Sequence, residues 1–131
     1  MEFAGVSMLR FVILALMGAA GTIARYILGG WAHQIFGSQF PFGTFIVNAS
    51  GCLAIGFLGT LADERSFFSS ELRLAVMLGF LGAFTTYSSF AYETWAMFRD
   101  GEFLFATLNI FGSFVICFVG LFLGVLLARL I

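Results

Sequence analysis

The sequence predicts an all-α membrane protein with four transmembrane helices in a single domain that covers residues 1–131. Hydrophobic residues make up 61% of the chain and charged residues only 10%, whereas a soluble domain has about 25% charged residues. The mean hydropathy is +1.06. Four apolar segments each reach the roughly 20 residues that a helix needs to cross a bilayer. No stretch is left over for a soluble domain.

The four segments run over residues 8–32, 42–62, 72–98 and 103–131, and short polar connections join them. The first connection contains the only proline, Pro41. The first segment begins like a signal peptide, with Arg10 before an apolar run. It is longer than a signal-peptide core and contains Arg25, so we interpret it as a transmembrane helix.

The arginines indicate how the chain is oriented in the membrane. The six basic residues are all arginine and the net charge is −1, so nothing indicates a nucleic-acid partner. The side that carries both termini has Arg10, Arg65, Arg73 and Arg129, and the other side has Arg25 and Arg99. Lys and Arg near helix ends set orientation. This small bias permits insertion both ways, and hence an antiparallel dimer of one chain; one fixed orientation remains the alternative.

Cysteine, histidine and glycine give structural expectations. Cys52 and Cys117 lie in different apolar segments with no other ligands near them in the sequence, so we expect two small buried thiols rather than a disulfide or metal site. The lone His33 is expected at the membrane interface. Glycine occurs 16 times. Gly120 and Gly124 form a pair of small residues four apart, which favours tight helix packing in lipid.

The third segment contains the unusual stretch GFLGAFTTYSSFAYE, residues 79–93. Polar groups at membrane depth need internal partners or a water-filled path. Gly82 weakens a helix, and Thr85 and Thr86 can bond to carbonyls of the preceding turn and bend it. A break would free carbonyl oxygens, which hard cations take as ligands. The alternative is an unbroken helix with a Gly/Thr packing face.

Other side chains suggest a path for an anion. Phe84, Tyr87 and Phe90 are spaced i, i+3, i+6 and Phe80 extends them into one aromatic column. Aromatic edges carry partial positive charge, although plain packing gives the same spacing. Further polar candidates are Asn48, the neighbours Ser88 and Ser89, the pair Asn109 and Ser113, and the charges Arg25 and Glu93. Asn48 could donate to an anion or form an interhelical hydrogen bond.

These residues resemble the Fluc (also called CrcB) fluoride channels over nearly the whole chain. The motifs that carry the resemblance are GTIARY at residues 21–26, PFGT at 41–44 followed by Asn48, and GFLGAFTTYSSF at 79–90 followed by Glu93. The resemblance implies a passive fluoride channel that exports fluoride across the cell inner (plasma) membrane and relieves its toxicity. It also implies a dual-topology antiparallel homodimer with two pores and a break in the third helix.

The resemblance further implies roles for individual residues. Backbone carbonyls of Gly82 and Thr85 would hold one structural Na⁺ that is not transported. The fluoride pore would be lined by Asn48, Tyr87, Ser88, Ser89, Phe90, Asn109 and Ser113, with Arg25 and Glu93 as vestibule or coupling charges. The chain departs from the family pattern at Tyr87, where many members have Phe, and at Ala91, which replaces a common serine. A paralogous chain is therefore a second possible partner.

Two other functions compete with this one. A small four-helix proton-coupled multidrug exporter would explain the size, the weak charge bias and the aromatic residues. Such exporters use a carboxylate in the first helix, and residues 8–32 contain none. A non-transporting membrane assembly subunit would leave Asn48, Thr85 and Glu93 without a task. The sequence contains no nucleophile–base set, metal-ligand cluster or phosphate loop, so it does not predict an enzyme.

Overall fold

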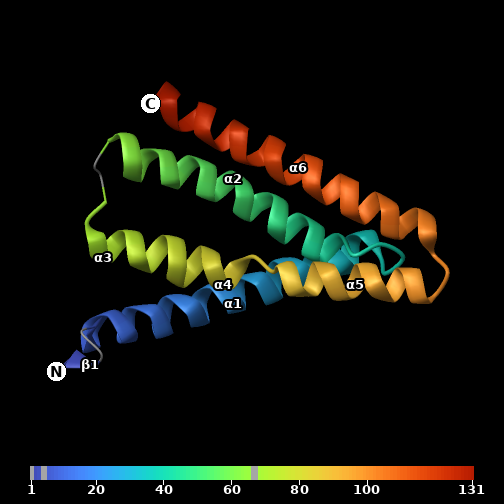
Figure 1. The fold of residues 1–131 in the computed structure, drawn as a ribbon, viewed down its shortest axis with the longest axis horizontal. Helices are drawn as coiled ribbons and strands as arrows, with labels where there is room; N and C mark the ends of the chain where they lie inside the picture. Colours follow the sequence, from blue (N-terminus) through green and yellow to red (C-terminus); the bar gives the residue numbers. More distant parts are fainter. Residues whose placement is uncertain (1, 4–5, 66–67) are drawn as a thin grey trace.

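The computed structural model describes residues 2–3, 6–65 and 68–131, and Figure 1 shows their arrangement. The elements are β1 (Glu2–Phe3), β2 (Val6–Ser7), α1 (Met8–Phe36), α2 (Phe42–Glu64), α3 (Ser70–Arg73), η1 (Leu74–Leu81), α4 (Gly82–Phe84), α5 (Tyr87–Arg99) and α6 (Phe103–Leu130). In this part of the chain, four helical spans are long and apolar enough to cross a membrane. The third of these is the composite Ser70–Arg99. The predicted four-helix architecture is confirmed.

Helix α1 begins at a side-chain cap and ends at a glycine with a positive φ. The Ser7 side chain accepts a hydrogen bond from the Leu9 N–H (3.3 Å) and so caps the start of α1. At the other end Gly37 has φ = 81° and its N–H donates to the His33 carbonyl. Helix α1 therefore runs one turn beyond the predicted end at residue 32. The two-residue strands β1 and β2, which pair antiparallel, were not predicted.

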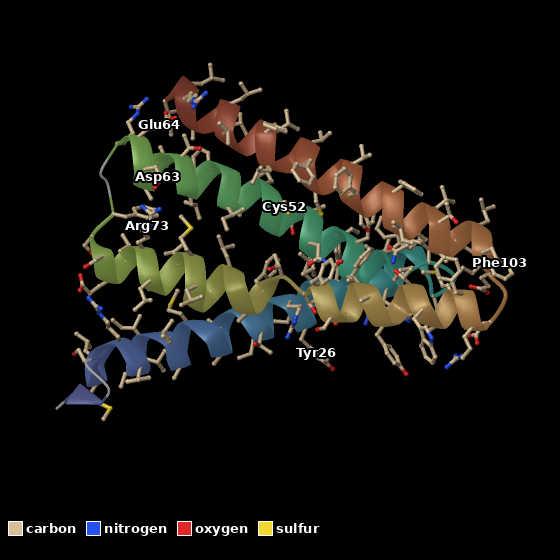
Figure 2. The ribbon with its side chains drawn as sticks, viewed as in Figure 1. Tyr26, Cys52, Asp63, Glu64, Arg73 and Phe103 are labelled. Carbon is tan, nitrogen blue, oxygen red and sulfur yellow. The ribbon has the colours of Figure 1, made fainter. Side chains whose placement is uncertain are left out.

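The start of α1, the end of α2, the start of α3 and the end of α6 lie at one end of the molecule, as the four-span topology predicts (Figure 1). The arginines at this end are paired with carboxylates on neighbouring elements, and Asp63, Glu64 and Arg73 are labelled in Figure 2. The pairs are Arg10–Glu71 (3.7 Å), Arg73–Asp63 and Arg129–Glu64 (2.6 Å). Arg65 donates to the main-chain oxygen of Ile131. These bonds tie together the ends of four elements.

Helices α2 and α6 run in the same direction and pack closely along their length (Figure 1). Glycines make this approach possible. A Cβ at Gly56 would collide with the Leu121 carbonyl, and one at Gly124 would collide with the Leu53 carbonyl. A Cβ at Gly120 would lie 3.1 Å from the Ala49 carbonyl oxygen. The predicted packing role of the Gly120–Gly124 pair is confirmed.

The third span is not one regular helix. It begins with the short α3, continues as the π-helix η1, and ends its first half in α4. Residues 85 and 86 interrupt it before α5 begins. The predicted break is confirmed, whereas the π-helical stretch was not predicted. Helix α1 approaches this span at Gly21, where a Cβ would collide with the Phe80 carbonyl.

Candidate functional site

The break in the third span is built by two adjacent threonines. Both have extended backbones, with φ −80° and ψ 157° at Thr85 and φ −149° and ψ 109° at Thr86. The Thr85 N–H and hydroxyl both donate to the Leu81 carbonyl, each at 3.1 Å, which closes the upstream turn. The Thr86 hydroxyl accepts from the Ser89 N–H at 3.3 Å and caps α5. One threonine therefore ends a helix and the next begins another.

Asn48 on α2 satisfies the peptide groups that the break exposes. Its Nδ2 donates to the Thr86 carbonyl at 2.9 Å, and its Oδ1 accepts from the Thr86 N–H at 2.7 Å. These two opposite bonds fix the orientation of the amide. Asn48 thus forms the interhelical hydrogen bond that was one of its two predicted roles. One Nδ2 hydrogen remains free of these two bonds and is available as a donor.

The break removes helical partners from carbonyl oxygens beside it. In a continuous helix the Thr86 N–H would donate to the Gly82 carbonyl, but here it donates to Asn48 instead. Among the described residues, no backbone N–H donates to the carbonyl of Thr85, which lies between the two helices. Unpaired carbonyls at membrane depth are tolerated only where they are buried in protein or line a cavity. The Thr85 carbonyl oxygen therefore needs cover by protein or by a polar cavity.

Gly82 and Thr85 line a groove of about 680 Å³ between α2, the third span and α6. We call it the central groove. Among the predicted site residues it is lined by Asn48, Gly82, Thr85, Tyr87, Phe90 and Ser113. The rings of Tyr87 and Phe90 have centroids 5.5 Å apart and are tilted by 42°. Tyr87 is 78% exposed in the single chain, so its ring and hydroxyl are open to whatever fills the groove.

The predicted single aromatic column is wrong, because the break divides it into two pairs. Phe80 and Phe84 stack at 5.9 Å with an interplanar angle of 10°. Phe84 is buried, at the end of α4. Tyr87 and Phe90 belong to α5 and line the central groove. Only the second pair is placed to meet an ion there.

A second hollow of about 390 Å³ lies between α1, α2 and α5, and we call it the side pocket. Its lining includes Arg25, Thr44, Thr86, Ser89 and Glu93. The Glu93 Oε1 accepts from the Thr44 hydroxyl at 2.8 Å, whereas its Oε2 is buried without a hydrogen-bond partner among the described residues. Among the residues that the structure describes, no ion pair joins Arg25 to a carboxylate. Thr86 lines both hollows.

The sequence matches the family model described as CrcB-like protein, Camphor Resistance (CrcB), over residues 12–125. The chain belongs to the CrcB family. Three similar relatives are each named Fluoride-specific ion channel FluC. The relative from Geobacter sulfurreducens is 43% identical and that from Desulforapulum autotrophicum 46%, each over 93% of this chain and 98% of the relative. The relative from Nitrosococcus oceani is 42% identical over 90% of this chain and 94% of its own.

This CrcB chain is a multi-pass membrane protein, in agreement with the expected inner-membrane location. Its predicted site residues are divided between the two hollows. Arg25, Ser89 and Glu93 line the side pocket rather than the central groove. Ser88 and Asn109 are among the lining residues of neither hollow. Ser88 is exposed, with its hydroxyl 3.4 Å from that of Thr86.

Asn109 joins α5 to α6 in this CrcB chain. Its side chain is 1% exposed and its Nδ2 donates to the Thr94 hydroxyl at 2.9 Å. The Thr94 hydroxyl in turn donates to the Phe90 carbonyl at 2.7 Å. The Ser113 hydroxyl, which also lines the central groove, donates to the Asn109 Oδ1 at 3.3 Å. These successive hydrogen bonds hold the backbone of Phe90 against α6.

Three threonines with clear contacts were absent from the predicted site: Thr44, Thr86 and Thr94. Thr44 and Thr86 stand inside the motifs that carry the family resemblance, and Thr94 is a hydroxyl in an apolar segment. The signal that could have identified them is the requirement that every hydroxyl at membrane depth finds a partner. That requirement identifies the threonine as important, but it does not predict which residue bonds to it.

Proposed function

We propose that this chain is a fluoride-selective ion channel that passively exports fluoride across the inner membrane, and that it works as a channel rather than an enzyme. We take fluoride as the transported ion because the relatives are named fluoride-specific ion channels. The observation that carries the proposal is the broken third span, whose residues Gly82 and Thr85 line one groove with Tyr87 and Phe90. A helix that only anchored the chain in lipid would have no use for such a break.

The groove offers the chemistry that fluoride requires. Fluoride is small and tightly hydrated, so a pore must replace its water with other donors. Asn48 retains one amide hydrogen, Tyr87 adds a hydroxyl, and the rings of Tyr87 and Phe90 offer positive edges. In this proposal Ser88, Ser89, Asn109 and Ser113 continue the polar track, and Arg25 and Glu93 serve its vestibule.

A second copy of the chain, in the opposite orientation, is the proposed cover of the central groove. Gly82 is exposed in the single chain, and the Thr85 carbonyl has no backbone donor among the described residues. Lipid cannot satisfy such backbone groups. An antiparallel copy would bury them and give two pores related by symmetry, and a paralogous chain would cover the groove in the same way. The weak arginine bias permits both orientations.

A structural Na⁺ fits the break. Gly82 and Thr85 both line the central groove, and backbone carbonyl oxygens are the hard ligands that such a cation takes. We propose that these two residues, with the same pair from the second copy, hold the ion. When bound it supplies positive charge near the pores and is not itself transported.

Efflux from liposomes tests the proposed function. Purified protein in liposomes loaded with potassium fluoride should release fluoride, measured with a fluoride electrode, while chloride-loaded liposomes release almost none. Fluoride release no faster than from empty liposomes would contradict the proposal, and so would equal rates for the two ions. Efflux that required a proton gradient or an organic cation would instead favour the multidrug exporter.

A matched pair of phenylalanine substitutions tests the aromatic part of the path. Phe90→Ile removes a groove-lining ring, so fluoride efflux should fall by at least about tenfold, which corresponds to about 1.4 kcal/mol of barrier. Phe122 is 62% exposed on α6 and does not line the groove, so Phe122→Ile should leave efflux nearly unchanged. Equal efflux from both variants would remove Phe90 from the proposed path.

A further inference from the structure

The two cysteines of the chain face each other across the α2–α6 contact. Arg129 and Glu64, which are 65 positions apart, bond at one end of this contact. Leu121 and Gly56 meet with the same separation near its middle. Cys117 and Cys52 have that separation too, so the register of the two parallel helices places them side by side. Figure 2 labels Cys52 on the stretch of α2 that runs beside α6.

In the single chain the thiols are accessible as well as adjacent. The two thiols lie close enough for an electrostatic interaction with each other, and both are free and half-buried rather than fully buried. Both also line the central groove. We expected two small buried thiols; both are free but half-buried, and the packing of α2 against α6 brings these two distant positions together.

The number of ligands restricts what the pair can bind. Among the described residues, no group of three or more His, Cys, Asp or Glu side chains could hold a metal ion. Structural zinc needs four such ligands, so two thiols do not make a zinc site. Soft thiolates select soft cations, and two-coordinate binding suits thiophilic d¹⁰ ions such as Hg²⁺, Ag⁺ and Cu⁺.

We propose that Cys52 and Cys117 form a two-thiolate site for one thiophilic d¹⁰ cation on the wall of the central groove. With Hg²⁺ as the probe, two S–H bonds break, two S–Hg bonds form and two protons leave to water, with no change of oxidation state. A dication and two thiolates make a neutral unit. Neutrality favours the site at membrane depth, where an uncompensated charge is costly.

Intact-mass measurement tests this site without any use of transport. Purified full-length protein in detergent is incubated with one equivalent of HgCl₂ per chain, washed with a small monothiol, unfolded and alkylated with N-ethylmaleimide. The native chain should retain one mercury and show complete loss of alkylation at both cysteines. Cys52→Ser and Cys117→Ser each leave a single thiol, so they should lose at least about tenfold more mercury in the wash.

Several results would overturn the proposal. These are mercury that blocks only one thiol of the native chain, single-cysteine variants that retain mercury as well as the native chain, and mercury that links two chains. Loss of both thiols without bound mercury would show a disulfide and would equally exclude the metal site. Each result is read from mass alone, so it stands whether or not the chain conducts fluoride.

Discussion

Asn48 performs a task that the backbone normally performs for itself. Its amide bonds both the N–H and the carbonyl of Thr86, and so replaces two ladder bonds lost at the break. A buried peptide group left without a partner costs about 1–3 kcal/mol, although single interhelical bonds in membranes average only about 0.6 kcal/mol. The break is therefore stable because one side chain from another helix supports it.

Replacing Asn48 by leucine should destabilise the protein by about 1–4 kcal/mol, because both Thr86 groups lose their partner while the branched shape of the side chain is kept. Ser50→Ala is the matched control, since Ser50 donates only to the Val47 carbonyl of its own helix. That change should stay within about 0.5 kcal/mol. Equilibrium unfolding of the purified variants gives both values, and equal losses would show that the amide does not support the break.

Asn48 also shows how far the sequence identifies the site. An asparagine in an apolar segment is conspicuous, so its importance could be predicted. Its partner could not, because Thr86 lies 38 positions away and meets it only after the helices pack. The same holds for Asn109 and Thr94, and for the two cysteines. Sequence spacing therefore finds polar residues but does not assign their contacts.

The helical spans were predicted well, because length and apolar composition determine what can cross a bilayer. The break could also be anticipated, since glycine and adjacent threonines disturb a helix. The π-helix η1 could not be anticipated. Its residues 74–81 are apolar throughout, so the pattern has no polar face from which the number of residues per turn could be measured.

Close contact between α2 and α6 depends on particular glycines rather than on glycine in general. Gly56→Ala should destabilise the protein by about 1–3 kcal/mol, because its Cβ would overlap the Leu121 carbonyl of a rigid helix. Gly59 lies on the same helix, and a Cβ added there would have no neighbouring atom within 4 Å. Gly59→Ala should be neutral or stabilising by up to about 1 kcal/mol. Thermal unfolding in detergent distinguishes the two, and equal shifts would contradict the packing assignment.

Charge is paired at both ends of the molecule. Three arginines at the end with the termini form ion pairs with Glu71, Asp63 and Glu64. At the opposite end Arg99 donates to both oxygens of Asp100, and these bonds lower the pKa of that carboxyl below its usual value. Asp100 therefore stays ionised at neutral pH. Paired arginines at both ends are compatible with the weak orientation bias of the chain.

If the chain inserts both ways, a cleavable tag at its N-terminus should be split between the two faces of the membrane. Protease added to sealed inner-membrane vesicles should remove about half of the tag, because the two orientations are populated equally. A tag that is fully cleaved or fully protected would contradict dual topology. Vesicles opened with detergent provide the control in which all of the tag is cleaved.

The bond between Asn48 and Thr86 also bears on how the chain is made. Helix α2 precedes the third span in the sequence, so during synthesis it enters the membrane first. When Thr86 arrives, the amide that satisfies its peptide groups is already present at that depth. The favourable insertion free energy of the third span thus includes a contribution that exists only because of the helix made before it. The order of the helices along the chain is consequently part of what allows a broken helix to be inserted into lipid.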